Sequence, residues 1–449
     1  LVPNEIDIVI NLLNGLGKKL NAVTHLDAEF SKNQSISLSK REKNLPLFGV
    51  PLAHKELYGR VKDDGNAWPD EGGSKSYKNN KARKTAFVIE KLDNSGAIDC
   101  GRLTSVEYAL GVTGHNDWSG TPKNPWNFDY VCGGSSSGSG AIVAAGIIPG
   151  ALGSDTGGSI RLPAAACGLV GIKPTHGLVS RDGVFPLSDS LDTVGPLTRS
   201  VIDAAEILQI ISGYDFNDKS SIKTKIINYT DYLNSPIDNI RVGLPKNYFL
   251  TGSDTEMSDY TSDSFDLISK IGAKCVDIKI PNIDTINSLN FLLIATEAAK
   301  IHHDNILSKH NELNEQTLMR ILAGIYTSSD EHQKLHQCRS QMLKKILSDV
   351  FQEVDIIVTP VWPFNLPTIK NSDLGANPDA EPLVQRIGHN TRPVNFLGLP
   401  AVCLPTGFDK NGLPVSLQLI GSPFSEGKLL NLAKQLESEY CFWDNKPKI

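Results

Sequence analysis

Residues 133–175 read GGSSSGSGAIVAAGIIPGALGSDTGGSIRLPAAACGLVGIKPT, a composition that no other part of the chain has. Glycine and serine at this density usually indicate a flexible linker. However, Ile, Leu, Val and Ala are threaded through this segment, and a solvated linker would not carry them. We therefore expect a buried system of loops around a short Ala/Ile helix, in which the backbone approaches its surroundings closely.

On both sides of this segment, apolar runs typical of strands alternate with stretches of helical periodicity. Strands are expected at 47–52, 97–100, 240–244, 275–280, 354–359, 401–404 and 415–420. Helices are expected at 6–21, 85–92, 106–110, 201–212, 259–271, 297–347 and 428–439. This alternation predicts an α/β fold with a mixed central sheet.

Composition excludes several classes of protein. The 449 residues include 44 basic and 50 acidic side chains, so the formal charge is −6. The chain therefore lacks the excess of positive charge that is typical of nucleic-acid-binding proteins. The longest apolar stretch, 141–152, is interrupted by glycine and proline and is too short to span a bilayer. The seven cysteines form no CxxC pair, so we expect neither a zinc ribbon nor a disulfide scaffold, and we expect a cytoplasmic location.

Nucleotide and metal motifs are incomplete. No glycine run is followed by the lysine of a phosphate loop, and Gly138-x-Gly140 lacks the third glycine of a dinucleotide fingerprint. His332 and His336 stand four residues apart on an expected helix, but Gln333 occupies the place of the glutamate in HExxH. The sequence therefore predicts no metal and no organic cofactor.

Two serines of the 133–175 segment are candidate nucleophiles. Ser136 stands in a GxSxG pattern, which in α/β-hydrolase esterases requires a strand leading directly into the turn, and 129–132 is a weak strand. Ser159 follows Gly157 and Gly158, which permit a tight turn whose N–H groups converge on a developing oxyanion. We favour Ser159 and keep a Ser136 esterase as an alternative.

A serine nucleophile needs a base. Lys55, in GVPLAHKEL, follows small apolar residues and is a candidate buried lysine. Burial lowers the pKa of an ammonium group, so such a lysine can be neutral near physiological pH. Ser135, which follows two glycines, could relay a proton between Lys55 and Ser159.

Taken together, these motifs resemble the amidase signature hydrolases. The 133–175 block is similar to the signature of that family almost throughout, and GVPLAHKEL at 49–57 is similar to the strand that carries its lysine. KNPWN at 123–127, GVFPLSDSLDTVGPLTRSV at 183–201 and FLGLPAVCLPTGFDKNGLPVSLQLIG at 396–421 also fit. The resemblance covers nearly the whole chain.

The resemblance implies a Ser-Ser-Lys triad and a pocket around it. The family lysine falls on Lys55, the bridging serine on Ser135 and the nucleophile on Ser159. Backbone N–H groups around the nucleophile, at Thr156, Gly157 and Gly158, would form the oxyanion hole. Ala109 would line the acyl side of the pocket. The pocket walls are expected from 109–126, 185–189 and 300–340.

The resemblance also implies one large domain over residues 1–449, with a twisted mixed sheet covered by helices on both faces. Its signature core would span about 45–200, with a polar insertion or seam at about 214–236 and a variable helical region at about 297–347. The implied activity is hydrolysis of a small-molecule amide by a stand-alone amidase, without metal or cofactor. A homodimer is compatible with the family. The alternative within the family is the glutaminase subunit of a tRNA-dependent amidotransferase.

Overall fold

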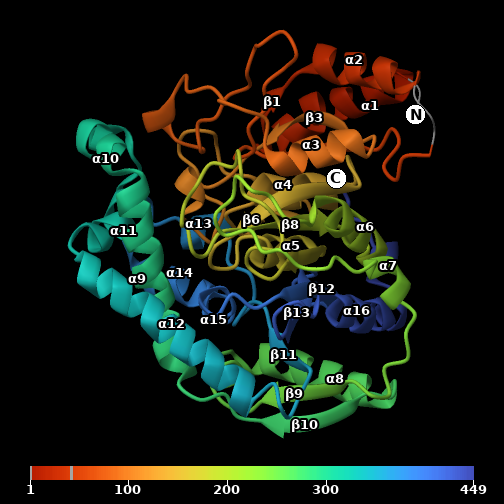
Figure 1. Ribbon diagram of the computed structural model, residues 1–449, viewed down its shortest axis with the longest axis vertical. Helices are drawn as coiled ribbons and strands as arrows, with labels where there is room; N and C mark the ends of the chain where they lie inside the picture. The colour runs from red at the N-terminus through yellow and green to blue at the C-terminus, as the bar shows by residue number, and fades with distance from the viewer. Residues whose placement is uncertain (1–2, 41–43) are drawn as a thin grey trace.

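An eight-stranded mixed sheet runs through the molecule (Figure 1). The computed structural model describes residues 3–40 and 44–449. Its strand order is β10-β9-β11-β13-β12-β7-β8-β6. The strands are β6 (Gly150–Asp155), β7 (Val170–Lys173), β8 (Thr193–Thr198), β9 (Arg241–Pro245), β10 (Lys274–Ile278), β11 (Ile356–Pro360), β12 (Ala401–Phe408) and β13 (Pro414–Gly421). Strand β9 pairs in parallel with β10 and β11, and the other neighbours are antiparallel. The predicted mixed sheet is confirmed.

Both faces of this sheet are buried. On β12, Val402 and Leu404 join one hydrophobic cluster with residues of two helices, whereas Cys403 joins a second cluster on the opposite face. Side chains alternate along a strand, so helices on both sides are needed to cover them. The first face packs against α6 (Val201–Ile211) and α16 (Glu426–Tyr440), and the second against α4 (Ser137–Ala144) and α5 (Arg161–Cys167).

The N-terminal part of the chain adds a smaller sheet of order β1-β3-β2. Its strands are β1 (Val23–Leu26), β2 (Pro51–Lys55) and β3 (Ile98–Leu103), and its helices are α1 (Pro3–Leu12), α2 (Ala28–Leu38) and α3 (Phe87–Asn94). Strand β2 lies against β6 of the large sheet, where the Tyr58 hydroxyl donates to the Gly153 carbonyl at 2.6 Å. A short ribbon follows, formed by β4 (Lys123–Asn124) and β5 (Asn127–Val131).

The helical tract expected at 297–347 consists of several helices. It contains α9 (Ile283–Ile301), α10 (His303–Lys309), α11 (Glu315–Ile325) and α12 (Ser329–Asp349), which lie along one side of the molecule in Figure 1. Helix α12 begins at a capping box in which Ser328 and Glu331 bond each other's backbone N–H. Helices α9 and α11 are in contact at Gly324, where an added Cβ would lie 1.9 Å from the Ala295 carbonyl oxygen.

The remaining helices are short or cover the edge at β9 and β10: α7 (Tyr229–Tyr232), α8 (Thr255–Lys270), α13 (Ile369–Ser372), α14 (Glu381–Ile387) and α15 (Arg392–Phe396). Residues 214–236 contain little regular structure beyond α7. No helix within the described residues has both the length and the apolar character needed to cross a membrane.

One expectation about the glycine-rich segment was wrong. Residues 133–175 are not mainly loops, because they form α4, β6, α5 and β7 in succession. The apolar run at 47–52, expected as a buried strand or its edge, is mostly turn and leads into the strand that begins at Pro51. Strands β6 and β8 were also missed, because both of their faces are buried and their sequences show no alternation of polar and apolar residues.

Candidate active site

Lys55 lies at the end of β2 and is fully buried. Its Nζ donates to the Oγ of Ser135 at 2.7 Å and to the Oγ of Ser154 at 2.8 Å. Ser135 is equally buried and precedes α4, and the Gly134–Ser135 peptide bond is cis. The structure therefore brings the predicted lysine and bridging serine into direct contact, and it adds Ser154 of β6, which no sequence motif indicated.

Burial lowers the pKa of the Lys55 ammonium to about 7. The carboxylates of Asp192, Asp155 and Glu56 act in the opposite direction, but they do not offset the loss of hydration. A lysine with this pKa is neutral in a large fraction of molecules near neutral pH. Its amine can therefore accept a proton, which an ordinary surface lysine cannot do at this pH.

The turn after β6 is built around the carboxylate of Asp155. Its Oδ1 accepts the N–H of Gly158 at 2.8 Å, and its Oδ2 accepts the N–H of Ile160 at 3.2 Å and the Nε of Arg161 at 3.0 Å. Burial alone would raise the pKa of Asp155, but the charge and hydrogen bonds of Arg161 hold it well below its usual range. A permanently ionised carboxylate therefore fixes the backbone path of residues 156–160.

Gly158 is required by the geometry of this turn. Its φ is +130°, and a Cβ added there would lie 2.3 Å from the Oγ1 of Thr391. That same Oγ1 donates to the Gly157 carbonyl at 2.6 Å. Thr156 is held on the other side, where its hydroxyl donates to Asp192 Oδ1 at 2.6 Å. Side chains from three parts of the chain thus hold the turn on both sides.

Ser159 follows this turn and lines a cavity of about 340 Å³. Among the described residues, its hydroxyl has no hydrogen-bond partner, and the N–H groups of Gly157 and Ser159 donate to no protein acceptor. The N–H of Gly158, by contrast, is held by Asp155. The Ser159 backbone meets the bridging segment, since its carbonyl accepts the N–H of Ser136 at 3.3 Å, but Ser135 and Ser159 share no side-chain hydrogen bond.

Ala109 lines the same cavity as Ser159 and has a φ of +60° in the short 3₁₀ turn Glu107–Ala109. Leu110, Leu187 and Arg320 on the wall come from expected segments, but a large share of the wall comes from two segments that were not expected, 287–294 of α9 and 381–392. Within the expected helical region, Arg320 of α11 lines the cavity, and the contribution of α9 comes from residues before 297. Tyr326 is 85% exposed and lies outside this cavity.

Two arginines on the cavity wall were not identified from the sequence. Arg320 donates to the Leu110 carbonyl at 2.8 Å, and Arg392 donates to the Gln385 carbonyl at 2.9 Å. In the described part of the chain, neither guanidinium has a carboxylate within 4.0 Å. Burial lowers the pKa of Arg392 to about 10, with the charge of Arg320 adding to the effect, and both side chains remain cationic near neutral pH.

Unpaired amide groups lie beside these arginines. Asn290 is fully buried, and neither its Oδ1 nor its Nδ2 has a partner; the Oδ1 of Asn287 is also unpaired. A Cβ added to Gly157 would lie 3.7 Å from the Asn290 Oδ1, so this amide is close to the turn before Ser159. Buried polar groups left without a partner are uncommon, and a bound ligand is one way to satisfy them.

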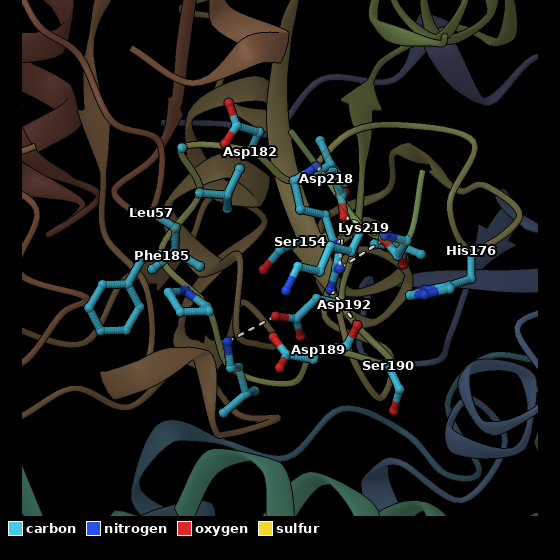
Figure 2. A pocket seen from close by; sticks show the side chains of 18 of the residues that line it. Leu57, Ser154, His176, Asp182, Phe185, Asp189, Ser190, Asp192, Asp218 and Lys219 are labelled. Atoms are coloured by element: carbon cyan, nitrogen blue, oxygen red, sulfur yellow. Dashed lines mark hydrogen bonds and ion pairs between the residues drawn. The ribbon is translucent and has the colours of Figure 1, made fainter. Parts of the chain in front are cut away.

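A second cavity, of about 610 Å³, has Ser154 in its lining (Figure 2). The Oγ of Ser154 accepts a hydrogen bond from the Nζ of Lys55. In Figure 2, Ser154 and Asp192 lie near the centre of its lining, with Leu57 and Phe185 to one side and His176 to the other. Ala109 and Leu187 line both cavities. Ser154 therefore connects this second cavity to Lys55, whereas Ser159 lines the first cavity.

The alternative nucleophile is less favourably placed. Ser136 is fully buried, and its Oγ accepts the N–H of Ser154 and donates to the Ser154 carbonyl, both at 3.3 Å. The strand before it, β5, ends at Val131 in a two-stranded ribbon rather than in the large sheet. A nucleophile elbow needs an exposed hydroxyl at the top of a sheet, and Ser136 does not have this position.

Comparison with known proteins gives the same picture. The sequence model of the Amidase family matches residues 9–430. The chain is 34% identical over 426 residues to a glutamyl-tRNA(Gln) amidotransferase subunit of Neisseria meningitidis, covering 90% of this chain and 86% of that protein. A bacterial aryl acylamidase of the amidase signature family superposes with a TM-score of 0.86 at 25% identity, covering 99% of this chain and 95% of that chain.

A further structure, a chain of a vestigial protein complex connected with the evolutionary origins of an s-triazine catabolic enzyme, has a TM-score of 0.89 at 28% identity and covers 100% of this chain and 96% of that chain. The chain therefore belongs to the amidase family, the amidase signature enzymes. It is an enzyme of the class that acts on amide carbon–nitrogen bonds. The resemblance inferred from the sequence is confirmed.

Proposed function

We propose that this protein is a stand-alone amidase that hydrolyses a carboxylic amide through an acyl-enzyme on Ser159. The observation that carries the proposal is the 2.7 Å contact between the Nζ of Lys55 and the Oγ of Ser135, made by a fully buried lysine. A buried amine that contacts a serine hydroxyl is suited to proton transfer, and it contributes little to the stability of the fold.

In the proposed reaction, Ser159 Oγ attacks the amide carbonyl carbon while its proton passes to Ser135, whose own proton passes to the neutral amine of Lys55. The resulting tetrahedral oxyanion accepts N–H bonds from Gly157 and Ser159. Collapse of this intermediate breaks the carbon–nitrogen bond, and the proton returns along the same path to the leaving nitrogen. Protonation is essential because an amide nitrogen leaves poorly as an anion.

Deacylation repeats the sequence with water. Water attacks the ester carbonyl of the acyl-enzyme and gives its proton to Lys55 through Ser135. The ester bond to Ser159 then breaks, the carboxylic acid leaves, and the proton returns through Ser135 to the Ser159 oxygen. We assign Ser154 to positioning the Lys55 amine and Gly158 to shaping the turn, because its N–H is bonded to Asp155. Thr156 supports the turn through Asp192, and Ala109 lines the acyl side of the pocket.

The pocket favours an acyl group that carries a carboxylate of its own. Arg320 and Arg392 lie on the wall of the Ser159 cavity without a carboxylate partner, and the amide of Asn290 is unpaired nearby. Guanidinium groups bind carboxylates strongly, in many cases through two parallel hydrogen bonds. We therefore propose monoamides of small dicarboxylic acids as the substrate class.

A second candidate, the glutaminase subunit of a tRNA-dependent amidotransferase, is favoured by two observations. The relative from Neisseria meningitidis is named as part of such an amidotransferase, and glutamine carries an α-carboxylate that the same arginines could bind. Glu381 lines the same cavity and could face an α-ammonium group. This function would require partner subunits, whereas a stand-alone amidase needs only the small-molecule substrate.

We further propose that residues 1–449 form one amidase domain, because groups from Lys55 to Arg392 converge on a single site. Since all seven cysteines are free thiols, a reducing cytoplasm is the proposed location. A homodimer is compatible with this proposal, and every residue to which the proposal gives a role belongs to the same chain. Neither nucleic acid nor a membrane enters the proposed function.

The proposal is tested by measuring ammonia or amine release by the purified chain alone. The substrates are matched sets of monoamides of dicarboxylic acids, neutral aliphatic and aromatic amides, and glutamine. Turnover of the dicarboxylic monoamides by the isolated chain supports the stand-alone amidase. Turnover of glutamine alone, increased by a co-purified partner, would support the glutaminase instead.

A further inference from the structure

Three side chains with metal-ligating atoms come together away from the Ser159 pocket. They are Glu297 of α9 and His332 and His336 of α12, and within the described residues they form the one group of three that could hold a metal ion. The sequence alone argued against a metal here, because Gln333 replaces the glutamate of HExxH. In the folded chain the carboxylate comes from a different helix.

The three ligand atoms form a nearly regular triangle. The Nε2 of His332 lies 3.3 Å from the Oε1 of Glu297, the Nε2 of His336 lies 3.5 Å from the same oxygen, and the two nitrogens are 3.1 Å apart. Tetrahedral zinc with ligands at its usual distances of 2.0–2.2 Å separates neighbouring ligand atoms by about 3.3 Å. The triangle therefore has the size of one face of a zinc tetrahedron before any ion is placed.

Hydrogen bonding alone does not explain this convergence well. If the Nε2 of His332 carries a proton and donates it to Glu297, it cannot also accept a proton from His336. If His336 also carries a proton on Nε2, the two hydrogens point at the same small space. A single cation at the centre of the triangle would instead use the lone pairs of all three atoms.

The carboxylate is held in the orientation that such an ion needs. Glu297 Oε1 accepts the Ser190 hydroxyl at 2.8 Å, while Oε2 accepts the Ser190 N–H at 3.0 Å and the hydroxyl of Ser188. Partners of this kind orient metal ligands and raise their affinity. The side chain of Glu297 is 4% exposed, whereas those of His332 and His336 are 23% and 39% exposed, which leaves an approach from solvent.

We propose that Glu297, His332 and His336 bind one Zn²⁺ ion, with water as the fourth ligand. Two histidines and one glutamate form a ligand set known to bind zinc in proteins. The ion would connect α9 and α12 to the segment around Ser188 and Ser190. Arg339, one turn along α12, is held by the Phe396 carbonyl, and its charge opposes the cation, so the Glu297 carboxylate is indispensable to the site.

The position of the site suggests a structural role near the substrate pocket. The N–H groups of Leu187 and Ser188 donate to Asp192 Oδ2 at 2.8 and 3.0 Å, and Asp192 in turn accepts the hydroxyl of Thr156. An ion at Glu297 would therefore fix the same segment that supports the turn before Ser159. It would not contact the reacting atoms.

The test is zinc binding by the purified, tag-free chain after treatment with a chelator and dialysis. We expect titration calorimetry with ZnCl₂ to give one ion per chain, and Co²⁺ to give the visible absorption of a tetrahedral site. The variants His332→Ala and His336→Ala should lose this binding. His303→Ala, at an exposed histidine on α10, is the matched control and should bind as the unaltered chain does.

Ser190→Ala keeps all three ligands but removes one hydrogen bond to the carboxylate, and it should weaken zinc binding about 10–100-fold. Circular dichroism and Tm without zinc establish that each variant is folded, and zinc should raise Tm only where the site is intact. Equal zinc stoichiometry in the His332→Ala and His336→Ala variants, or no binding to the unaltered chain, would overturn the proposal. Neither result depends on amidase activity.

Discussion

The Nζ of Lys55 and the Oγ of Ser135 lie 2.7 Å apart inside the protein, although 80 residues separate them in the sequence. The contact forms because β2 of the small sheet lies against β6 of the large one, which directs the lysine toward the start of α4. Both side chains are removed from solvent, so the amine has lost much of the hydration that would keep it protonated. Proton transfer between these groups is the basis of the predictions below.

Replacing the proposed nucleophile should eliminate turnover without unfolding the chain. Ser159→Ala removes a hydroxyl that has no hydrogen-bond partner among the described residues, so Tm should change by little. We expect kcat to fall by at least about 10⁴-fold, as is usual when a nucleophile is deleted. Ser136→Ala is the matched control and should retain turnover; an inactive Ser136→Ala beside an active Ser159→Ala would assign the nucleophile to Ser136.

The rate should depend on pH through Lys55. The pKa of this ammonium is lowered by burial to about 7, and only the neutral amine can accept a proton. Below this value kcat/KM should therefore fall about tenfold for each pH unit, and above it the rate should level off. The dependence of kcat/KM on pH is measured at constant buffer strength with a neutral amide, because the charge of such a substrate does not change with pH.

Glu56 provides the control for that profile, because burial raises its pKa to about 7 as well. Its Oε1 accepts the N–H and the hydroxyl of Ser105, at 2.8 and 3.0 Å, and we give it no part in proton transfer. The acidic limb should remain in Glu56→Gln. Loss of the limb in that variant would show that the profile reports the glutamate and not Lys55.

The two pocket arginines should determine preference for anionic substrates. Arg320→Gln or Arg392→Gln removes a charged donor, and hydrogen bonds to charged groups contribute about 1.5–3 kcal/mol. We expect kcat/KM for monoamides of dicarboxylic acids to drop about 10–150-fold, while neutral amides are hydrolysed at nearly unchanged rates. Equal losses for both kinds of amide would mean that the arginines support the fold of the pocket only.

Gly158 and Gly157 should respond differently to the same substitution. Gly158→Ala places a Cβ 2.3 Å from Thr391 Oγ1 at a φ of +130°, and strained backbone of this kind costs about 1–3 kcal/mol even without the clash. We expect a lower Tm and loss of activity. Gly157→Ala meets nothing closer than 3.5 Å, so its Tm should stay close to that of the unaltered chain. Equal Tm values for both variants would contradict the described turn.

Much of the site could be predicted from the sequence because its key residues lie in continuous motifs. The glycine pair before Ser159 indicates a tight turn, and the small apolar residues before Lys55 indicate burial. Both signals come from the local sequence. Ser154, Arg320 and Arg392 could not be found in this way. Ser154 lies inside the 133–175 segment, but nothing there distinguishes it from the other serines, and the two arginines reach the site through packing between distant elements.

The fold shows the same division. Strands β12 and β13 and helices α6 and α16 were predicted because their apolar residues follow a clear pattern. The strand Gly150–Asp155 was missed, since glycine and serine at buried positions are the opposite of a typical strand composition. These small residues leave room for the close approach of Ser136, whose Oγ would lie 2.7 Å from a Cβ at Gly153. The small residues that made this strand hard to predict are therefore the ones that allow the close packing against Ser136.

The most direct test of the central claim is to locate the covalent adduct. The purified chain is treated with a fluorophosphonate probe, digested, and analysed by mass spectrometry, with Ser159→Ala and Lys55→Met treated in parallel. We predict one adduct, on the peptide containing Ser159, absent from Ser159→Ala and formed far more slowly in Lys55→Met. An adduct on Ser136, or labelling of Ser159→Ala at the rate of the unaltered chain, would contradict the account.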